Sequence, residues 1–142
     1  MMQLIRVQDD LPDDFSTLRA EADAEGFRAM SRLAAEWAAT PGMFVCLLAA
    51  VDAGGLAAIG GLTAEPEPAG EPALRMRRLY VRPAARRAGV GRTLANALLQ
   101  EALDSVALVT VNAGGTLAPA FWTALGFTVV QGRPWTHEFR PG

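Results

Sequence analysis

The segment from Leu79 to Gln100, LYVRPAARRAGVGRTLANALLQ, limits the folds open to this chain more than any other. A short apolar run ends at Val81, a loop rich in arginine and glycine follows, and residues 89–104 carry apolar side chains at helical spacing. The first N–H groups of a helix have no internal partner, and the helix dipole adds positive charge there. The segment therefore predicts either a binding site for a diphosphate or similar anion, or an ordinary tight turn between a strand and a helix.

The candidate anion site combines small residues with cationic ones. Gly89 and Gly91 would let a phosphate approach the main chain, because they carry no Cβ. Arg86, Arg87 and Arg92 would add guanidinium donors, whose forked geometry suits phosphate oxygens. We expect Gly89→Val or Gly91→Val to abolish anion binding and leave the fold intact, because a branched side chain would occupy the space of the phosphate.

Charge is distributed unevenly along the chain. All thirteen basic residues are arginines, and seven of them lie between residues 75 and 92, whereas eight of the fifteen acidic residues precede residue 37. The arginines near the glycine loop indicate an anion site, although solvated surface charge also explains individual ones. The formal net charge of −2 does not favour a nucleic-acid partner.

Composition restricts the class of protein further. A chain of 142 residues with 51% hydrophobic residues is expected to form one domain over residues 1–142. One histidine and one cysteine, the apolar and buried Cys46, argue against a Cys/His metal site, so no metal is expected. The N-terminus lacks a secretory pattern, and no apolar run reaches about 18 residues, which predicts a cytoplasmic protein without a membrane segment.

Periodicity and turn residues predict the order β-α-α-β-β-β-α-β-α-β-β, a mixed α/β sheet with crossover helices. Two helices are expected within residues 14–40, interrupted near Gly26. The other expected helices cover 89–104 and 117–125, and the expected strands cover 3–7, 43–51, 56–64, 73–81, 106–112, 127–131 and 136–140.

Two common nucleotide-binding motifs fit the loop poorly. A P-loop ends in Gly-Lys-Ser/Thr, and this chain contains no lysine. A Rossmann fingerprint needs a third small residue three positions after Gly91, where this chain has Leu94, and an acid at the end of the next strand, where it has Asn112. A nucleotide-binding α/β domain of another kind stays open as an alternative.

Two motifs resemble those of the GNAT family of N-acetyltransferases. The stretch VRPAARRAGVG is similar to the family's pyrophosphate-binding loop, Arg/Gln-x-x-Gly-x-Gly/Ala after a strand ending near Val-x-Pro, with Arg86, Gly89 and Gly91 at the fixed positions. Downstream, VN at 111–112 resembles the end of the family's fifth strand, and APAFWTALGF at 118–127 resembles its Ala-x-x-x-Tyr-x-x-x-Gly-Phe segment. The resemblance covers the chain from 74 to 127.

The resemblance implies a fold and an activity. The fold would be α/β (α+β), with a mostly antiparallel twisted sheet of about seven strands and about four helices, splayed between the fourth and fifth strands. The activity would be acetyl transfer from acetyl-CoA to an amino group of a small molecule or peptide, by direct attack in a ternary complex. A homodimer is common in such families and fits the apolar C-terminal strands.

The resemblance also assigns residues to the cosubstrate. The main chain of Leu79, Tyr80 and Val81 would bind the pantetheine arm like an added strand, and Asn112 would contact the same arm. Trp122 would pack beside the thiol end or in the core. The main-chain amides of the loop would hold the diphosphate, and these belong to Arg86, Arg87, Ala88, Gly89, Val90, Gly91 and Arg92.

Departures from the family pattern leave the catalytic residues open. Trp122 stands where the family often has a tyrosine that protonates the leaving thiolate, and an indole N–H is not a usable acid. The family's glutamate base falls at Arg75 in this chain, so Glu71, with Glu65 and Glu67 as neighbours, is the candidate base, or else a solvated loop charge. His137 in a late strand is a further candidate, or else a surface histidine.

The loss of these residues leaves a second functional class open. A noncatalytic coenzyme A-binding module would retain the loop without a base or acid. For an enzyme, the acid-rich stretch within residues 14–40 would attract a cationic amine, and its acids are Asp14, Glu21, Asp23, Glu25 and Glu36.

Overall fold

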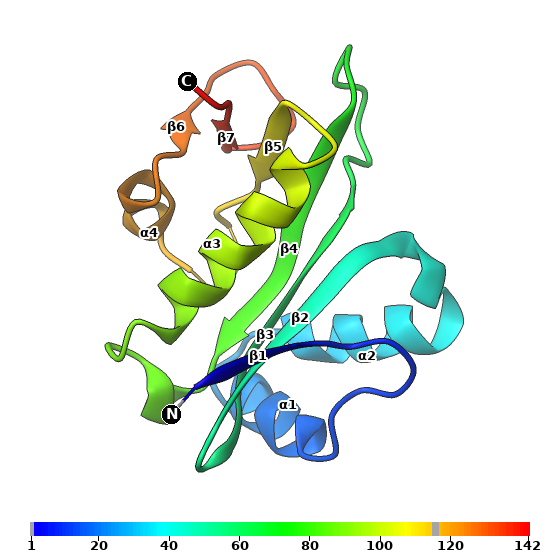
Figure 1. Cartoon of the computed structure of the whole chain (residues 1–142), viewed down its shortest axis with the longest axis vertical. Coiled ribbons are helices and arrows are strands. Elements are labelled where there is room, and N and C mark those ends of the chain that lie inside the picture. Colours follow the sequence, from blue (N-terminus) through cyan, green and yellow to red (C-terminus); the bar gives the residue numbers. More distant parts are fainter. Residues whose placement is uncertain (1, 115–116) are drawn as a thin grey trace.

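Seven strands form one sheet that carries helices on both faces (Figure 1). The computed structural model describes residues 2–114 and 117–142. The strands are β1 (Gln3–Arg6), β2 (Phe44–Asp52), β3 (Gly55–Ala64), β4 (Ala73–Val81), β5 (Leu108–Val111), β6 (Thr128–Val129) and β7 (His137–Phe139). The helices are α1 (Phe15–Ala24), α2 (Ala29–Ala39), α3 (Val90–Leu103) and α4 (Pro119–Ala124), with short 3₁₀ turns at Pro41–Met43 and Pro83–Ala85.

The strand order is β1-β2-β3-β4-β5-β7-β6. Strands β4 and β5 pair in parallel, and every other neighbouring pair is antiparallel. The predicted fold class and element order are therefore confirmed. Strand β5 is shorter than expected, because the Asn112 side chain accepts a hydrogen bond from the Gly114 amide at 3.3 Å and turns the chain away from the sheet.

Apolar side chains fill both faces of the central strands. Residues of β2 and β3 alternate between one cluster packed against α3 and another packed against α1 and α2. Leu94 and Leu98 of α3, and Leu18 and Leu33 on the opposite face, are completely buried. Because helices cover both faces, these strands are apolar at nearly every position, and the sequence shows continuous apolar runs rather than alternation.

Strands β4 and β5 separate soon after they pair. Their ladder joins Ala73–Arg75 to Leu108–Thr110, although β4 continues to Val81. Over the part of the chain that the structure describes, no strand pairs with β4 on this side beyond Arg75. The separation of the fourth and fifth strands, expected from the resemblance, is confirmed.

A β-bulge interrupts β4 within the separated part. Ile59 and Gly61 of β3 pair with Tyr80 and Arg77, so β4 holds one extra residue there. Arg78 supplies it, with a φ of 58° that non-glycine residues seldom adopt. A bidentate ion pair holds this strained residue, since its Nε and Nη2 donate to Glu36 of α2 at 2.8 and 2.7 Å.

The bulge changes which β4 side chains share a face. Leu74 and Met76 pack in the cluster at α3, and beyond the bulge Leu79 and Val81 do so, with the opposite parity. The other side chains of β4 consequently face α2. Arg77 and Arg78 thus lie on the same side of the sheet as Arg75. Regular alternation would have placed these two consecutive arginines on opposite faces.

A buried carboxylate stands where β4 and β5 separate. The side chain of Glu65 is only 2% exposed, and it accepts hydrogen bonds from Arg75 at 2.8 and 3.1 Å and from the Thr110 hydroxyl at 2.6 Å. Arg75 and Thr110 form the last pair of the parallel ladder. The interpretation of Glu65 as a solvated loop charge is wrong, because its amide pairs with Ala73 at 3.0 Å and folds the loop back onto the sheet.

Candidate functional site

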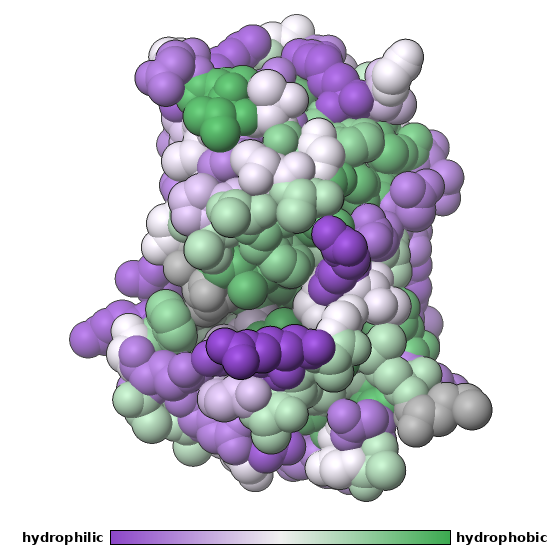
Figure 2. All heavy atoms as spheres, turned by 90° about the vertical axis from the view of Figure 1, so that its left-hand side faces the viewer, coloured by the Kyte–Doolittle hydropathy of each residue, from purple (hydrophilic) through white to green (hydrophobic). Residues whose placement is uncertain are grey.

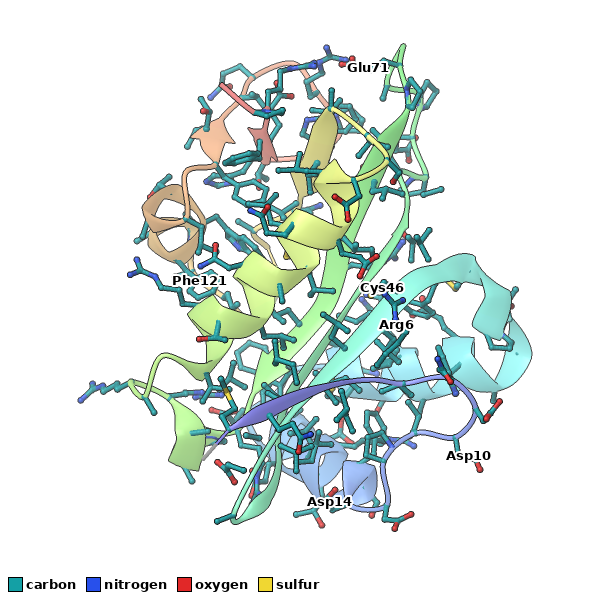
Figure 3. All side chains as sticks on the ribbon, viewed as in Figure 1. Arg6, Asp10, Asp14, Cys46, Glu71 and Phe121 are labelled. Carbon is teal, nitrogen blue, oxygen red and sulfur yellow. The ribbon has the colours of Figure 1, made fainter. Side chains whose placement is uncertain are left out.

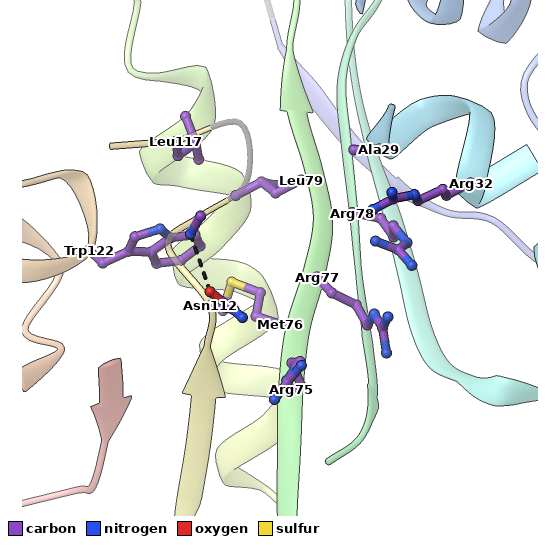
Figure 4. A pocket seen from close by; sticks show the side chains of 11 residues that line it. Ala29, Arg32, Arg75, Met76, Arg77, Arg78, Leu79, Asn112, Leu117 and Trp122 are labelled. Carbon is purple, nitrogen blue, oxygen red and sulfur yellow. Dashed lines mark hydrogen bonds between the residues drawn. The ribbon is translucent and has the colours of Figure 1, made fainter. Parts of the chain in front are cut away.

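A pocket of about 350 Å³ occupies the space between the separated strands (Figure 4). It lies between β4, the end of β5, the start of α2 and the segment leading into α4. Arginines form one wall and mostly apolar side chains form the other. The lining residues are Ala29, Arg32, Arg75, Met76, Arg77, Arg78, Leu79, Asn112, Gly114, Leu117 and Trp122.

The cationic wall is only partly neutralised by the protein. Arg75 pairs with Glu65, and Arg78 pairs with Glu36 at 2.7 Å. Arg77 makes no ion pair within residues 2–114 and 117–142, and its Nε is buried without a hydrogen-bond partner there. Burial and the adjacent Arg78 charge both lower the pKa of Arg77. Glu36 and Glu65 offset part of this effect, so the pocket keeps a cationic wall that the protein neutralises only in part.

The second feature of the site is the start of α3. Gly89 caps the helix in the left-handed region, with φ 78° and ψ 7°. The first intrahelical bond runs from the Thr93 amide to the Gly89 carbonyl at 3.0 Å. Among the described residues none accepts a hydrogen bond from the main-chain N–H groups of 87–92. A Cβ on Gly89 would meet no atom within 4 Å, so the space over these donors is open.

Gly91 has a different role from Gly89. A Cβ on Gly91 would lie 3.1 Å from Val81 Cγ2 and 3.5 Å from the ring of Phe121. Its small size lets α3 pack closely against β4. We therefore expect Gly91→Val to disturb the packing of α3 against β4, unlike the earlier expectation of an intact fold, and Gly89 is the more informative position.

The arginines of the loop divide into engaged and free groups. The Arg86 guanidinium pairs with Glu25 at 2.5 and 2.8 Å and donates from Nε to the Val81 carbonyl at 3.1 Å. Its main-chain N–H donates to the Pro83 carbonyl at 3.3 Å. Arg86 thus stabilises the loop through contacts with Val81 and Glu25. The exposed Arg87 and Arg92 make no ion pair with the described residues.

The acidic residues of α1 and α2 pair with arginines of the strand and loop. Glu21 pairs with Arg82 at 2.9 Å, and Glu25 and Glu36 pair with Arg86 and Arg78. Hydrogen bonding to these partners lowers the pKa of each glutamate. The uneven distribution of charge along the sequence therefore reflects ion pairs between separate segments.

The two remaining acids of this stretch are also engaged. The Asp14 carboxylate accepts a hydrogen bond from the Leu56 amide at 2.7 Å, and Asp23 accepts one from the Ser31 hydroxyl at 3.0 Å. No Asp or Glu lines the pocket among the residues described. The structure does not support the expectation that this stretch attracts a cationic amine, because arginines pair with its three glutamates and the pocket is lined by arginines.

Aromatic and amide side chains complete the pocket. Trp122 is 5% exposed and packs edge-on against Phe121 and Phe127, with ring centroids 5.0 and 5.4 Å apart. Asn112 lies beside it at the end of β5 (Figure 4).

Tyr80 does not line the pocket. It is completely buried in the cluster at α1 and α2, and its hydroxyl donates to Glu25. Burial raises the pKa of Tyr80, so its hydroxyl stays neutral.

Two of the three catalytic candidates do not line the pocket. Glu71 is near one end of the molecule (Figure 3), where its carboxylate pairs with Arg140 at 2.5 Å. His137 is 3% exposed, so its interpretation as a surface histidine is wrong. Its Nδ1 lies 2.8 Å from the Thr136 hydroxyl, and its Nε2 has no partner among the described atoms. Trp122 alone of the three lines the pocket.

Among the described residues, the requirements of a membrane-spanning helix and of a metal site are not met, and one face of the surface is hollowed. Of the helices described, none has the length and apolar character needed to cross a bilayer. Within residues 2–114 and 117–142, no three His, Cys, Asp or Glu side chains form a group able to hold a metal ion. The face that carries α4 has hydrophobic side chains gathered beside a hollow, with a band of hydrophilic side chains below them (Figure 2).

Comparisons with known proteins agree on one family. The family model described as "Acetyltransferase (GNAT) family" matches residues 5–127. Comparison with curated protein sequences gives no match. A protein of known structure from Exiguobacterium sp. 255-15, with a provisional acetyltransferase assignment, is 25% identical with a TM-score of 0.86, over 99% of this chain and 93% of that one.

Two further solved structures contain CoA or acetyl-CoA. The GNAT family N-acetyltransferase YhbS from Escherichia coli, in complex with CoA, is 18% identical with a TM-score of 0.69, over 98% of this chain and 81% of that one. A GNAT family acetyltransferase from Brucella melitensis, in complex with acetyl-CoA, is 16% identical with a TM-score of 0.66, over 100% of this chain and 89% of that one. At these identities the likeness concerns the fold.

Proposed function

The chain belongs to the GNAT acetyltransferase family, and from this premise we propose that it transfers the acetyl group of acetyl-CoA to an amino group of a small molecule or peptide. One observation carries the proposal. The unpaired amides at the start of α3 come soon after β4 in the chain, and residues 75–79 of that strand line the pocket. A ligand with a diphosphate and a long flexible arm fits this layout, and such ligands occupy the structural neighbours from E. coli and B. melitensis.

The cosubstrate would follow β4. Its diphosphate would accept hydrogen bonds from the amides of 87–92, where the dipole of α3 adds positive charge. Its pantetheine arm would lie along the part of β4 that continues beyond the ladder with β5, toward Val81. The thioester would then reach the pocket between Trp122 and Asn112 on one side and the arginine wall on the other.

The reaction would proceed by direct attack. The amine nitrogen attacks the thioester carbon, the new C–N bond forms and the C–S bond breaks. The nitrogen loses one proton to water, and the coenzyme leaves as a thiolate that takes up a proton. Because a thiol has a pKa of about 8.5, its departure needs little acid assistance, and Trp122 need not supply a proton.

The cationic wall would favour the reactive form of the amine. A free amine has a pKa near 10, so most of it is protonated at neutral pH. Nearby positive charges disfavour the ammonium form and lower that pKa. Arg32, Arg75, Arg77 and Arg78 line one wall of the pocket, and none of its described lining residues is a carboxylate or a histidine. The arginines would thus assist deprotonation electrostatically, with water as the proton acceptor.

The lack of a carboxylate or histidine among the described lining residues also supports a second candidate, a noncatalytic coenzyme A-binding module. Both candidates require the loop, and they differ in turnover. Calorimetry with acetyl-CoA, CoA, ATP and NAD tests the shared requirement, and thiol release from acetyl-CoA with a panel of amines tests the difference. We expect acetyl-CoA and CoA to bind, ATP and NAD not to bind, and at least one amine to release thiol. Binding without thiol release for every amine would favour the module.

A further inference from the structure

Two of the four pocket arginines form no ion pair with the described residues, although Glu36 acts on both at longer range. Arg75 and Arg78 each hold a bidentate pair with a glutamate. Arg77 and Arg32 make no ion pair with any described residue, and both line the pocket. The buried Nε of Arg77 also lacks a hydrogen-bond partner there. A half-buried guanidinium without a hydrogen-bond acceptor costs free energy, and a bound anion would supply that acceptor.

The backbone directs these charges to one place. The bulge at Arg78 brings Arg77 and Arg78 to the same side of β4, and Arg32 approaches from the first turn of α2 (Figure 4). Met76 and Leu79 point to the opposite side, toward Trp122 and Asn112. The pocket consequently has a charged half facing α2 and a less polar half facing α4.

We propose that the acceptor carries an anionic group, a carboxylate or a phosphate, that Arg77 and Arg32 bind in the charged half of the pocket. This inference rests on the proposed function, since it assigns the second substrate of the same site. Guanidinium forks match the paired oxygens of both anions. Polyamines and basic peptides are poor acceptors on this account, because an arginine-lined pocket repels them.

The proposal also has a consequence for stability. If Arg77 serves a ligand, its replacement by glutamine removes a charge that forms no ion pair and takes no hydrogen-bond partner from any described group. The free energy of unfolding should then stay constant or increase. Replacement of Arg78 by glutamine should lower it, because Glu36 loses its bidentate partner at a strained residue.

The test compares matched acceptors with wild type, Arg77→Gln, Arg77→Lys and the exposed-residue control Arg133→Gln. The probes are the common α-amino acids with their primary amides, and phosphoethanolamine with ethanolamine. Calorimetry measures their binding to the CoA-loaded protein, and thiol release measures kcat/KM with acetyl-CoA. Calorimetry with acetyl-CoA alone serves as the control for the cosubstrate site.

We expect wild type to favour at least one anionic probe over its neutral partner by about tenfold or more, as loss of a charge-assisted hydrogen bond implies. Arg77→Gln should lose this preference, Arg77→Lys should keep part of it, and Arg133→Gln should keep all of it. Acetyl-CoA affinity should be the same in all four proteins. The amino-acid and phosphoethanolamine pairs distinguish a carboxylate from a phosphate.

Each other outcome has a defined meaning. Equal use of anionic and neutral probes, an unchanged preference in Arg77→Gln, or no binding of any anionic probe would overturn the inference and leave acetyl transfer standing. Binding of an anionic probe that depends on Arg77, without thiol release for any amine, would support the anion site and contradict the proposed transfer.

Discussion

Replacement of Gly89 by valine should weaken acetyl-CoA binding by about a hundredfold or more. Gly89 adopts φ 78°, a region that costs an L-residue about 1–2 kcal/mol and that β-branched residues avoid, so the loop would change conformation. The amides from 87 to 92 would then no longer converge. Each hydrogen bond to a charged group contributes about 1.5–3 kcal/mol, so the loss of two accounts for the expected change in affinity.

Gly70→Val is the matched control for this prediction. Gly70 has φ 79°, and a Cβ on it would also meet no atom within 4 Å, but it lies in the exposed loop between β3 and β4. Both variants should lose similar amounts of stability in thermal unfolding, and calorimetry should show reduced acetyl-CoA affinity for Gly89→Val alone. Equal affinities in the two variants would mean that the phosphates bind elsewhere.

Replacement of Glu65 by alanine should destabilise the fold by about 3–5 kcal/mol, the usual effect of removing one partner from a buried ion pair. The change leaves Arg75 and the Thr110 hydroxyl without their acceptor where β4 and β5 separate. A domain of this size should lose roughly 10 °C in Tm. Differential scanning calorimetry and urea unfolding measure both quantities.

Two neighbouring variants sharpen the interpretation of Glu65. Glu65→Gln can still accept a hydrogen bond from Thr110, so it should fall between wild type and Glu65→Ala. Glu67→Gln changes an exposed residue of the same loop and should unfold like wild type. If Glu65→Ala unfolds within about 0.5 kcal/mol of wild type, the range of ordinary surface substitutions, the buried network does not hold the strands together.

Local patterns were enough to predict the order of elements and a glycine loop before α3. The start of α3 illustrates why, since the loop residues and the apolar spacing that mark it are adjacent in the sequence. The motif resemblance added the separation of β4 and β5, which no local pattern reports. Of the residues predicted to bind the cosubstrate, Leu79, Asn112 and Trp122 line the pocket, and their binding role stays a prediction.

The arginine wall could not be predicted because it depends on long-range features. Alternation along β4 would have placed Arg77 and Arg78 on opposite faces, and only the bulge brings them together. The bulge is held by Glu36, 42 residues earlier in the chain. Ion pairs of this kind also removed Glu21 and Glu25 from consideration as an acceptor surface. The sequence signal for this wall was that all basic residues are arginines, with seven of them between residues 75 and 92. That signal did not show which arginines form ion pairs within the protein.

The central claim is that the amides at the start of α3 hold the diphosphate of acetyl-CoA. A crystal structure of the protein grown with acetyl-CoA tests it most directly. We predict phosphate oxygens within hydrogen-bond distance of the main-chain nitrogens of Gly89–Arg92, with the thioester beside Trp122 in the arginine-lined pocket. Phosphates bound at another place, for example beside Arg82 in the pocket next to the β2–β3 turn, would contradict the claim.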